Sequence, residues 1–308
     1  MISPTVSPQR GPSAASARAL PRRVTRAPWH FRLAKSLIRS RVRGGYRLLA
    51  TARKLGWLDV VVRYPLNERI SLDVPLYRDE NLWNELDLRE YEAESIDLLA
   101  AEVSGRPEPV TLLDCGADIG LFSALLAARC PGIARVVAFE PNPEAFRVLA
   151  GNVRRLPAGE CHEMAVSDFT GRAMLEIPRP GMGDHARFIV PSSQGDVEVT
   201  RIDDLKVDPR HGLLLKIDVE GAELGVLRGA VRTLSAAPWF VVIFEAHPKV
   251  VQRTGIDPTE CMRLLGSVRR CRFRVAEAPE VSLTEDRPFF DQVPERICNI
   301  VCVSENED

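Results

Sequence analysis

The sequence lacks any run of about 18 uncharged apolar residues, so we expect no membrane-spanning helix. It also lacks paired cysteines. The seven cysteines are scattered and include no C-x-x-C pair, which argues against a disulfide framework and against a structural zinc site. Reduced, mostly buried thiols in a cytoplasmic protein fit this pattern best. With 45% hydrophobic and 27% charged residues, the 308-residue chain is typical of a globular protein with one large domain, with or without an appendage.

Acidic residues are missing from the first 58 residues, which hold 13 Lys and Arg. The net charge of the whole chain is only -1, so the remainder is strongly acidic, with 28 basic against 42 acidic residues. An acidic body suits neither non-specific DNA binding nor attachment to an anionic membrane. We therefore expect no specific nucleic-acid partner, and any such role would belong to the N-terminal arm.

The arm divides into two parts by composition. Residues 1–27 are rich in Ser, Pro, Ala and Arg, which predicts a disordered basic tail and, less favourably, an organelle transit peptide. Residues 28–65 predict a basic amphipathic helical segment, broken near Gly44-Gly45. Such a segment either docks on the acidic body, which we favour, or touches a membrane surface.

From residue 110 onward, apolar runs alternate with helical patterns. The runs "VTLLDC", "ARVVAFE", "GECHEMAV", "LLLKID" and "WFVVIFEAH" are mostly separated by helix-like stretches, and "ICNIVCV" follows the last of them. The stretch 141–156 predicts a helix with Asn142 as its N-cap and Pro143 at its first position, and 222–234 predicts a single helix. This alternation indicates an α/β fold with a mostly parallel sheet covered on both faces. The Gly- and Pro-rich segment 168–203 interrupts it and predicts a hairpin or lid-like insertion.

Ligands of an open parallel sheet bind beyond the carboxyl ends of its strands, and two of these ends carry suggestive residues. Gly116 and Gly120 in "LLDCGADIG" permit a tight turn and the close approach of a ligand. A nicotinamide fingerprint would also need glycines at 118 and 121, which are Asp and Leu. Glu140 closes the second strand and can accept hydrogen bonds from both ribose hydroxyls, unless it is merely solvated.

The end of the fourth strand, "LLKIDVEGAELGVLRGA", crowds Asp218, Glu220 and Glu223 together. Desolvating a carboxylate is costly, so one interpretation is a cationic or hydrogen-bonding ligand at this edge. The blander interpretation is a helix start, where the helix dipole favours a carboxylate.

The motifs "LLDCGADIG", "VVAFEPNP", "AVSDFTG", "TRIDDL" and "LLKIDVEGAELGVLRGA", in this order, resemble the FkbM family of S-adenosylmethionine-dependent methyltransferases. The resemblance covers roughly residues 90–250, and "KIDVEGAE" is its most specific element. "YEAES" at 91–95 is similar to the segment with which the family covers its cofactor. One departure is Asp118, where the family usually has Asn.

The resemblance implies a Rossmann-like class I methyltransferase fold: a seven-stranded, mostly parallel sheet with helices on both faces and an antiparallel last strand. Residues 66–308 would form this domain, with a cofactor-binding core at about 108–250. The implied cofactor is S-adenosyl-L-methionine. Its implied binding residues are Asp114, Gly116, Ala117, Asp118, Gly120, Glu140, Pro141, Asn142, Ala165 and Asp218.

The resemblance also distributes these residues along the cofactor. Asp114 and the 116–120 loop would approach its amino-acid end, Glu140 its ribose, and the segment 163–165 its adenine. Asp218 would lie near the methyl group, because carboxylates favour the sulfonium and ammonium cations.

Four residues are catalytic candidates: Asp218, Glu220, Glu245 and His247. A positioned base assists attack by a hydroxyl, and histidine has the most suitable ordinary pKa, although a His before Pro is more often a structural loop residue. No metal ligand is assigned, since nothing fixes a ligand geometry, and magnesium stays an alternative. Lys216 faces either into the sheet or toward the site. The blander interpretation is a buried lysine paired with a carboxylate.

The predicted function is methylation of a hydroxyl on a small-molecule or saccharide acceptor, a sugar or a natural product. The alternatives are N-methylation, nucleic-acid methylation, a nicotinamide-dependent dehydrogenase and a non-catalytic methyltransferase-like partner protein. The N-P-P-[YF] motif of amino-methylating DNA enzymes is absent after the fourth strand. A non-catalytic relative would be expected to have lost Asp114, Gly116 or Glu140, and all three are present.

Overall fold

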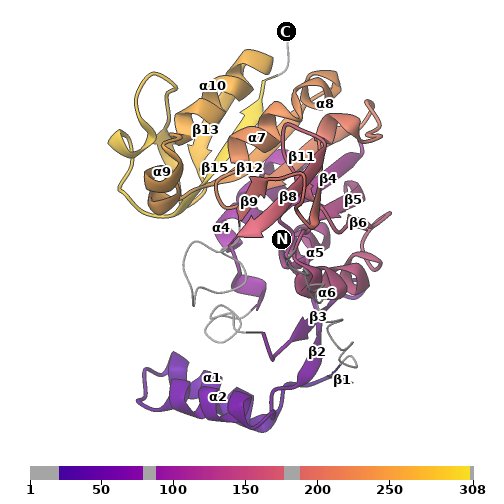
Figure 1. Ribbon diagram of the computed structural model, residues 1–308, viewed down its shortest axis with the longest axis vertical. Coiled ribbons are helices and arrows are strands. Elements are labelled where there is room, and N and C mark those ends of the chain that lie inside the picture. Colours follow the sequence, from indigo (N-terminus) through magenta and orange to yellow (C-terminus); the bar gives the residue numbers. More distant parts are fainter. Residues whose placement is uncertain (1–20, 79–87, 177–187, 306–308) are drawn as a thin grey trace, which may run out of the picture.

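The computed structural model describes residues 21–78, 88–176 and 188–305, and its centre is an eight-stranded sheet (Figure 1). The strand order is β14-β13-β15-β12-β11-β4-β5-β6. These strands are β4 (Val110–Cys115), β5 (Ile133–Phe139), β6 (Glu160–His162), β11 (Gly212–Ile217), β12 (Phe240–Ala246), β13 (Cys271–Val275), β14 (Ala278–Ser282) and β15 (Cys298–Ser304).

The central strands are parallel and apolar on both faces, as their continuous hydrophobic runs predict. Successive side chains of a strand point to opposite faces, so Leu112 and Leu113 of β4 belong to separate hydrophobic cores. Helices α4, α5 and α6 contribute to the first core, and α7, α8 and α10 to the second. These helices are α4 (Ala93–Val103), α5 (Leu121–Arg129), α6 (Pro143–Val153), α7 (Glu223–Arg228), α8 (Val231–Ala236) and α10 (Pro258–Val268).

The predicted antiparallel last strand is confirmed, because β15 runs antiparallel to both β12 and β13. The sheet has eight strands rather than the expected seven, since β14 folds back onto β13 as an edge strand. Most of β14 is partly or fully exposed, so it lacks the apolar run by which the other strands could be recognised in the sequence.

Two helix predictions have different outcomes. Helix α6 begins as expected, with the Asn142 side chain accepting a hydrogen bond of 3.1 Å from the Glu144 N–H and Pro143 in the first turn. The single helix expected over 222–234 is instead two short helices, α7 and α8, separated at Gly229. A Cβ atom at Gly229 would lie 2.1 Å from the Ser167 carbonyl oxygen, so the chain after β7 (Ala165–Val166) packs directly against this break.

The predicted insertion forms a second sheet of four strands in the order β7-β10-β8-β9. Strands β8 and β9 pair as the expected hairpin, and residues 177–187 between them lie outside the described residues. The Arg253 guanidinium of helix α9 (Pro248–Thr254) lies 4.6 Å from the centroid of the Phe188 ring, which joins the insertion to the main domain. The strands are β7 (Ala165–Val166), β8 (Gly171–Glu176), β9 (Phe188–Pro191) and β10 (Val197–Thr200). Single 3-10 turns lie at Leu88–Glu90, Ile202–Asp204 and Phe289–Asp291.

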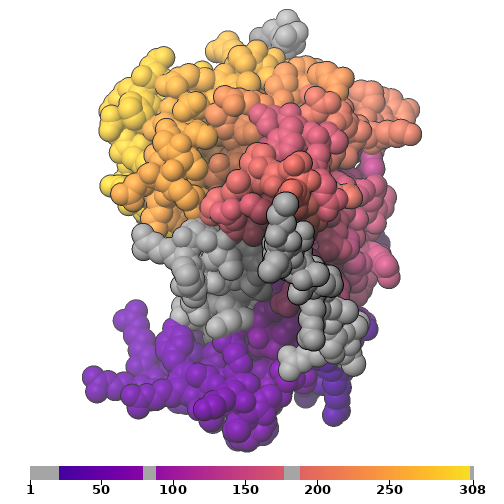
Figure 2. Space-filling view, in the orientation of Figure 1, coloured from indigo at the N-terminus to yellow at the C-terminus, as the bar shows by residue number. Residues whose placement is uncertain are grey.

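Residues 21–78, which we call the N-terminal unit, lie at one end of the molecule (Figures 1 and 2). The unit pairs helices α1 (Trp29–Arg39) and α2 (Gly45–Lys54) with a sheet of β1 (Arg22–Val24), β2 (Val60–Pro65) and β3 (Ser71–Pro75). It has its own small hydrophobic core. The predicted break between the helices is confirmed, since Gly44 has a φ of 106°.

Order begins earlier than the residue 28 boundary that composition suggests. Strand β1 lies inside the segment 1–27, where it pairs with β2, and the Arg23 guanidinium is 2.7 Å from the Asp73 carboxylate. Backbone pairing and a buried counter-charge hold residues whose composition alone would leave them disordered. Residues 1–20 lie outside the described part of the chain.

A buried asparagine fixes the N-terminal unit to the main domain. Asn152 of α6 accepts a hydrogen bond of 2.8 Å from the Asp73 N–H. Its side-chain amide donates to the carbonyl oxygens of Asp73, at 3.0 Å, and Ile119, at 2.7 Å. Strand β3 is thereby held beside the loop that follows β4. Among the described helices, none has the length and apolar character needed to cross a lipid bilayer.

Candidate functional site

The glycine loop, residues 116–120, follows β4 at the carboxyl edge of the main sheet. Gly116 has a φ of 78°, and its N–H donates a hydrogen bond of 3.0 Å to the Phe139 carbonyl oxygen. A Cβ atom at residue 116 would lie 1.8 Å from the Asp218 carbonyl oxygen. Only glycine fits this position, because the loop is wedged between the ends of β5 and β11.

Glu140 links the glycine loop to the start of α6. Its carboxylate is buried and accepts hydrogen bonds of 2.8 Å from the backbone N–H groups of Asp118 and Asn142, one on each oxygen. Burial, reinforced by the charge of Asp118, raises the pKa of Glu140 to about 7. Each carboxylate oxygen keeps a second lone pair that can accept a hydrogen bond from a ligand.

Arg78, which sequence reasoning missed, reaches the glycine loop from the end of the N-terminal unit. Its Nη1 lies 2.6 Å from the Asp118 Oδ1. The Arg78 side chain is only 4% exposed. A cationic partner at this position explains a carboxylate at residue 118, where the resembling family usually has an amide.

Lys216 of β11 occupies the centre of the acidic strand ends. Its Nζ donates a hydrogen bond of 2.7 Å to the Gly116 carbonyl oxygen, and lies 3.2 Å from an Asp218 oxygen and 3.4 Å from an Asp114 oxygen. Burial opposes the charge on Lys216, but the two carboxylates keep its pKa above the ordinary value. The blander interpretation of Lys216, a buried lysine with a carboxylate partner, is therefore confirmed.

Asp114 is fully buried at the end of β4. Its Oδ2 accepts a hydrogen bond of 2.6 Å from the Ser123 hydroxyl, whereas Oδ1 has no hydrogen-bond donor among the described residues and lies 3.4 Å from the Lys216 ammonium. An acidic oxygen that is buried without a donor is costly unless a cation or a ligand compensates it.

Glu92 adds another carboxylate from the segment just before α4. It has a φ of 45°, and burial raises its pKa to about 7, with Lys216 opposing and Asp218 reinforcing the shift. Lys216 interacts with Glu92, Asp114 and Asp218, and Asp218 in turn interacts with Glu220 and Glu245. These five carboxylates are called the carboxylate cluster below.

The turn after Asp218 uses two successive residues with positive φ, Glu220 at 53° and Gly221 at 105°. The Glu223 carboxylate accepts a hydrogen bond of 2.9 Å from the Gly221 N–H and so closes the turn at the start of α7. For Glu223 the helix-start interpretation is therefore the better one. Glu220 makes no such contact, and burial together with Asp218 raises its pKa to about 7.

Glu245 lies near the end of β12 and is the most strongly perturbed of the candidate carboxylates. Burial raises its pKa to about 9, and the negative charges of Asp218 and Glu220 add to the effect. Both effects favour the protonated form of this carboxyl group.

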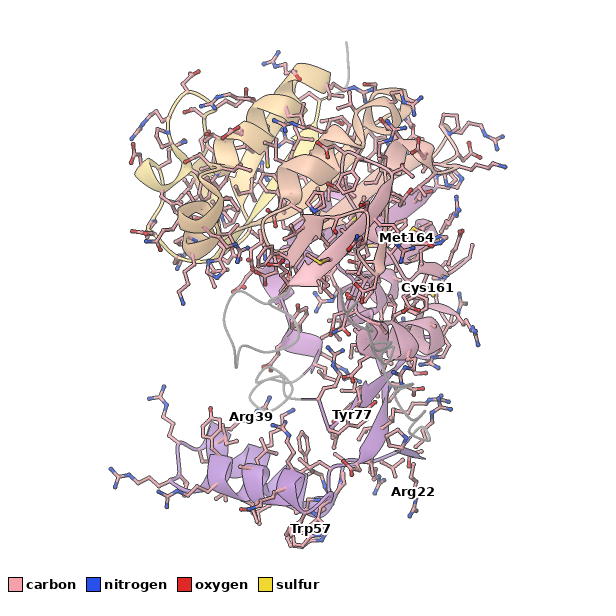
Figure 3. All side chains as sticks on the ribbon, viewed as in Figure 1. Arg22, Arg39, Trp57, Tyr77, Cys161 and Met164 are labelled. Carbon is pink, nitrogen blue, oxygen red and sulfur yellow. The ribbon has the colours of Figure 1, made fainter. Side chains whose placement is uncertain are left out.

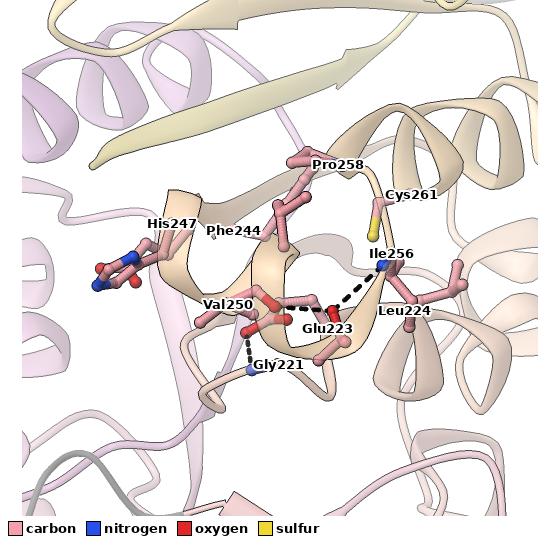
Figure 4. Close-up of a pocket in the computed structure, with 12 residues that line it drawn as sticks. Gly221, Glu223, Leu224, Phe244, His247, Val250, Ile256, Pro258 and Cys261 are labelled. Carbon is pink, nitrogen blue, oxygen red and sulfur yellow. Dashed lines mark hydrogen bonds between the residues drawn. The ribbon is translucent and has the colours of Figure 1, made fainter. Parts of the chain in front are cut away.

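His247 caps helix α9. Its Nδ1 accepts a hydrogen bond of 3.1 Å from the Lys249 N–H, so the neutral ring carries its proton on Nε2. Burial and the nearby cations Lys249 and Arg253 lower its pKa. His247 lines a small pocket with Glu223, Glu245 and Phe244, and Figure 4 shows its ring directed away from Glu223 and Cys261.

The remaining predicted cofactor residues surround these groups. Ala117 is buried and its N–H donates to the Phe139 carbonyl oxygen at 2.9 Å, while Pro141 connects Glu140 to the α6 cap. Ala165 is buried in β7, opposite Val199 of the insertion. Within the described ranges, no three His, Cys, Asp or Glu side chains are placed to hold a metal ion together.

Comparison with known proteins gives consistent similarities. The family described as the methyltransferase FkbM domain matches residues 114–292. Hexuronic acid methyltransferase AglP of Haloferax volcanii is 31% identical, over 62% of this chain and 74% of that protein. Methyltransferase sdnD of Sordaria araneosa is 27% identical, over 42% of this chain and 63% of that protein.

Solved structures include a methyltransferase FkbM from Methylobacillus flagellatus KT. It is 16% identical, with a TM-score of 0.40, and the match covers 85% of this chain and 72% of that one.

Proposed function

Since the chain belongs to the FkbM methyltransferase family and is an S-adenosylmethionine-dependent methyltransferase, we propose that it methylates a hydroxyl group of a sugar or natural product. The observation that carries the proposal is the carboxylate cluster beside the glycine loop, at the carboxyl ends of β4, β11 and β12. The similarity to a hexuronic acid methyltransferase supports a saccharide acceptor.

The donor set of this edge fits the cofactor. When bound, S-adenosylmethionine supplies an activated methyl group on a sulfonium, and it also carries an ammonium group. Asp114 has a buried oxygen without a hydrogen-bond donor among the described residues. The side chain of Asp218, at the same edge, is 37% exposed. Both favour a cation nearby. Lys216 balances part of the negative charge of Asp114 and Asp218, which stabilises this edge of the sheet when no ligand is bound.

Glu140 is proposed to hold the ribose, because each of its oxygens has an acceptor position left over. The glycine loop would then lie along the amino-acid end, with Gly116, Ala117 and Gly120 providing close backbone approach. Ala165 would contact the adenine, from the chain that follows β6.

The proton of the acceptor hydroxyl is assigned to a carboxylate rather than to His247. In its neutral form His247 carries a proton on Nε2 and uses Nδ1 at the helix cap, so it can donate a hydrogen bond but has no free basic nitrogen. Glu220 and Glu245, whose pKa values are about 7 and about 9, lie in the range in which a group can both take and return a proton. A cation bound beside them would favour their ionised, basic form.

The experiment is a methyl-transfer screen with the full chain, using isotopically labelled S-adenosylmethionine and hexuronic acids, neutral sugars and hydroxylated natural products. We expect a methyl ether on one class and no product from amines. Glu245→Gln should lower turnover by more than it weakens cofactor binding. Preferential methylation of an amine would refute the proposed acceptor class, and normal turnover of Glu245→Gln would refute the role of that carboxyl group.

A further inference from the structure

The helical pair α1–α2 exposes an unusual number of large apolar side chains. Of the eight such exposed side chains among the described residues, six lie between residues 29 and 57. They are Trp29, Leu33, Val42, Tyr46, Leu55 and Trp57. Since the helices already bury Phe31, Ala34, Leu49 and Ala52 against their own sheet, these six are additional to the packed face.

The two tryptophans gather where the start of α1 meets the end of α2. His30 lies between them, with ring centroids 5.6 Å from Trp29 and 5.4 Å from Trp57, and its Nε2 is 3.1 Å from the Trp57 carbonyl oxygen. Trp29 is 66% and Trp57 48% exposed. In Figure 3, Trp57 lies at the end of the molecule farthest from the main sheet.

The helical pair is also rich in positive charge. No Asp or Glu occurs before residue 59. The exposed side chains of Arg32, Arg41, Arg43, Arg47 and Lys54 form no ion pair with a carboxylate in the described part of the chain. A cationic surface without internal counter-charges has its complement in an anionic partner.

We propose that the helical pair binds the surface of an anionic lipid bilayer. Tryptophan and tyrosine favour the headgroup region of a membrane, and arginines beside them are attracted by anionic lipids. Single-stranded nucleic acid would also match the charge and could stack on the aromatic rings. The exposed aliphatic side chains Leu33, Val42 and Leu55 favour lipid, because they cannot stack on bases but can enter the interface.

The geometry places the bilayer on the outer side of the N-terminal unit. The unit is fixed to the main domain through Asn152 and Asp73, so a bilayer contacting Trp57 would hold the main domain at a defined orientation. This inference does not depend on the acceptor class, and methyl transfer to soluble acceptors is a separate property.

The test is flotation of the full chain with vesicles of phosphatidylcholine alone or with phosphatidylserine added. We expect the chain to float with the phosphatidylserine vesicles, with a blue shift of tryptophan fluorescence. Arg43→Gln combined with Arg47→Gln should weaken binding about 25-fold, at ~5-fold for each removed charge. Trp29→Ser combined with Trp57→Ser should weaken it by at least about tenfold.

Matched controls change the same chemistry on the main domain. Arg154→Gln with Arg296→Gln removes two exposed arginines that form no ion pair among the described residues, and Ile297→Ser removes an exposed apolar side chain; both variants should bind vesicles normally. Thermal unfolding of every variant checks that the fold is kept, which surface substitutions should allow.

Several results would overturn the inference. These are no flotation with anionic vesicles at low salt, equal losses in the control variants, or tighter binding to a single-stranded oligonucleotide than to the vesicles. A dimer that dissociates in the Trp29→Ser, Trp57→Ser variant would assign the surface to a second copy instead.

Discussion

Replacing Arg78 by methionine tests whether the N-terminal unit supports the cofactor site electrostatically. The substitution leaves the carboxylates of Asp118 and Glu140 without the guanidinium that lies 2.6 Å from Asp118. Removing one partner of a buried ion pair costs about 3–5 kcal/mol. Because the Asp118 side chain is 35% exposed, solvent screens part of this loss, and we expect about 2–3 kcal/mol in the free energy of unfolding.

Asp118→Asn provides the matched partner for a double-mutant cycle. Asparagine removes the orphan charge, so the double variant Arg78→Met, Asp118→Asn should regain stability relative to Arg78→Met. Urea unfolding of the four proteins should give a coupling energy of about 1–2 kcal/mol. In calorimetric titration, their affinities for S-adenosylmethionine should rank in the same order as their stabilities. Additive losses, within about 0.3 kcal/mol, would refute the electrostatic argument.

Three further predictions concern pH, the glycine loop and the hydrogen bonds of Asn152. Because the raised pKa values of Glu220 and Glu245 favour bound protons in the free protein, binding of S-adenosylmethionine should release protons at pH 7 and should tighten as the pH rises to 9. The free energy of unfolding without ligand should fall as the pH rises from about 5 through 9. Calorimetry in buffers of different ionisation enthalpy should show less proton release with S-adenosylhomocysteine, which lacks the sulfonium charge, and equal release with the two ligands would contradict this prediction. Gly116→Ala, with its Cβ 1.8 Å from a carbonyl oxygen and a positive φ, should cost more than about 1 kcal/mol and abolish measurable cofactor binding; a normal titration would show that the loop adapts. Asn152→Ala leaves three backbone groups without their hydrogen-bond partner and should lower the free energy of unfolding in urea by more than about 3 kcal/mol. A loss below about 1 kcal/mol would mean that water replaces the side chain.

The parallel core could be predicted because its signals are local. Each of the strands β4, β5, β11 and β12 is a continuous apolar run, and the helices between them have clear periodicity. The carboxyl ends of such strands meet at one edge, which is why Asp114, Glu140 and Asp218 could be assigned to the same region before the structure.

The missed features depend on contacts between distant segments. Arg78 lies 40 residues before Asp118, beyond the end of β3, and no pattern around it distinguishes it from a surface arginine. The helix break at Gly229 follows from the approach of Ser167, and the order of β1 from pairing with β2. The helix-cap contact of His247 could not be predicted for a similar reason, since it depends on the direction of the ring.

The Asn152 contact also has a consequence for the smallest chain that can fold. The matched family segment begins at residue 114, yet a chain cut there would lose β3, which satisfies the Asn152 amide, and Arg78, which compensates Asp118. The segment would also lack Glu92 and the helix α4 that covers one face of the sheet. The autonomous folding unit is therefore longer than the family segment, and dissecting this protein into modules requires a boundary ahead of β1.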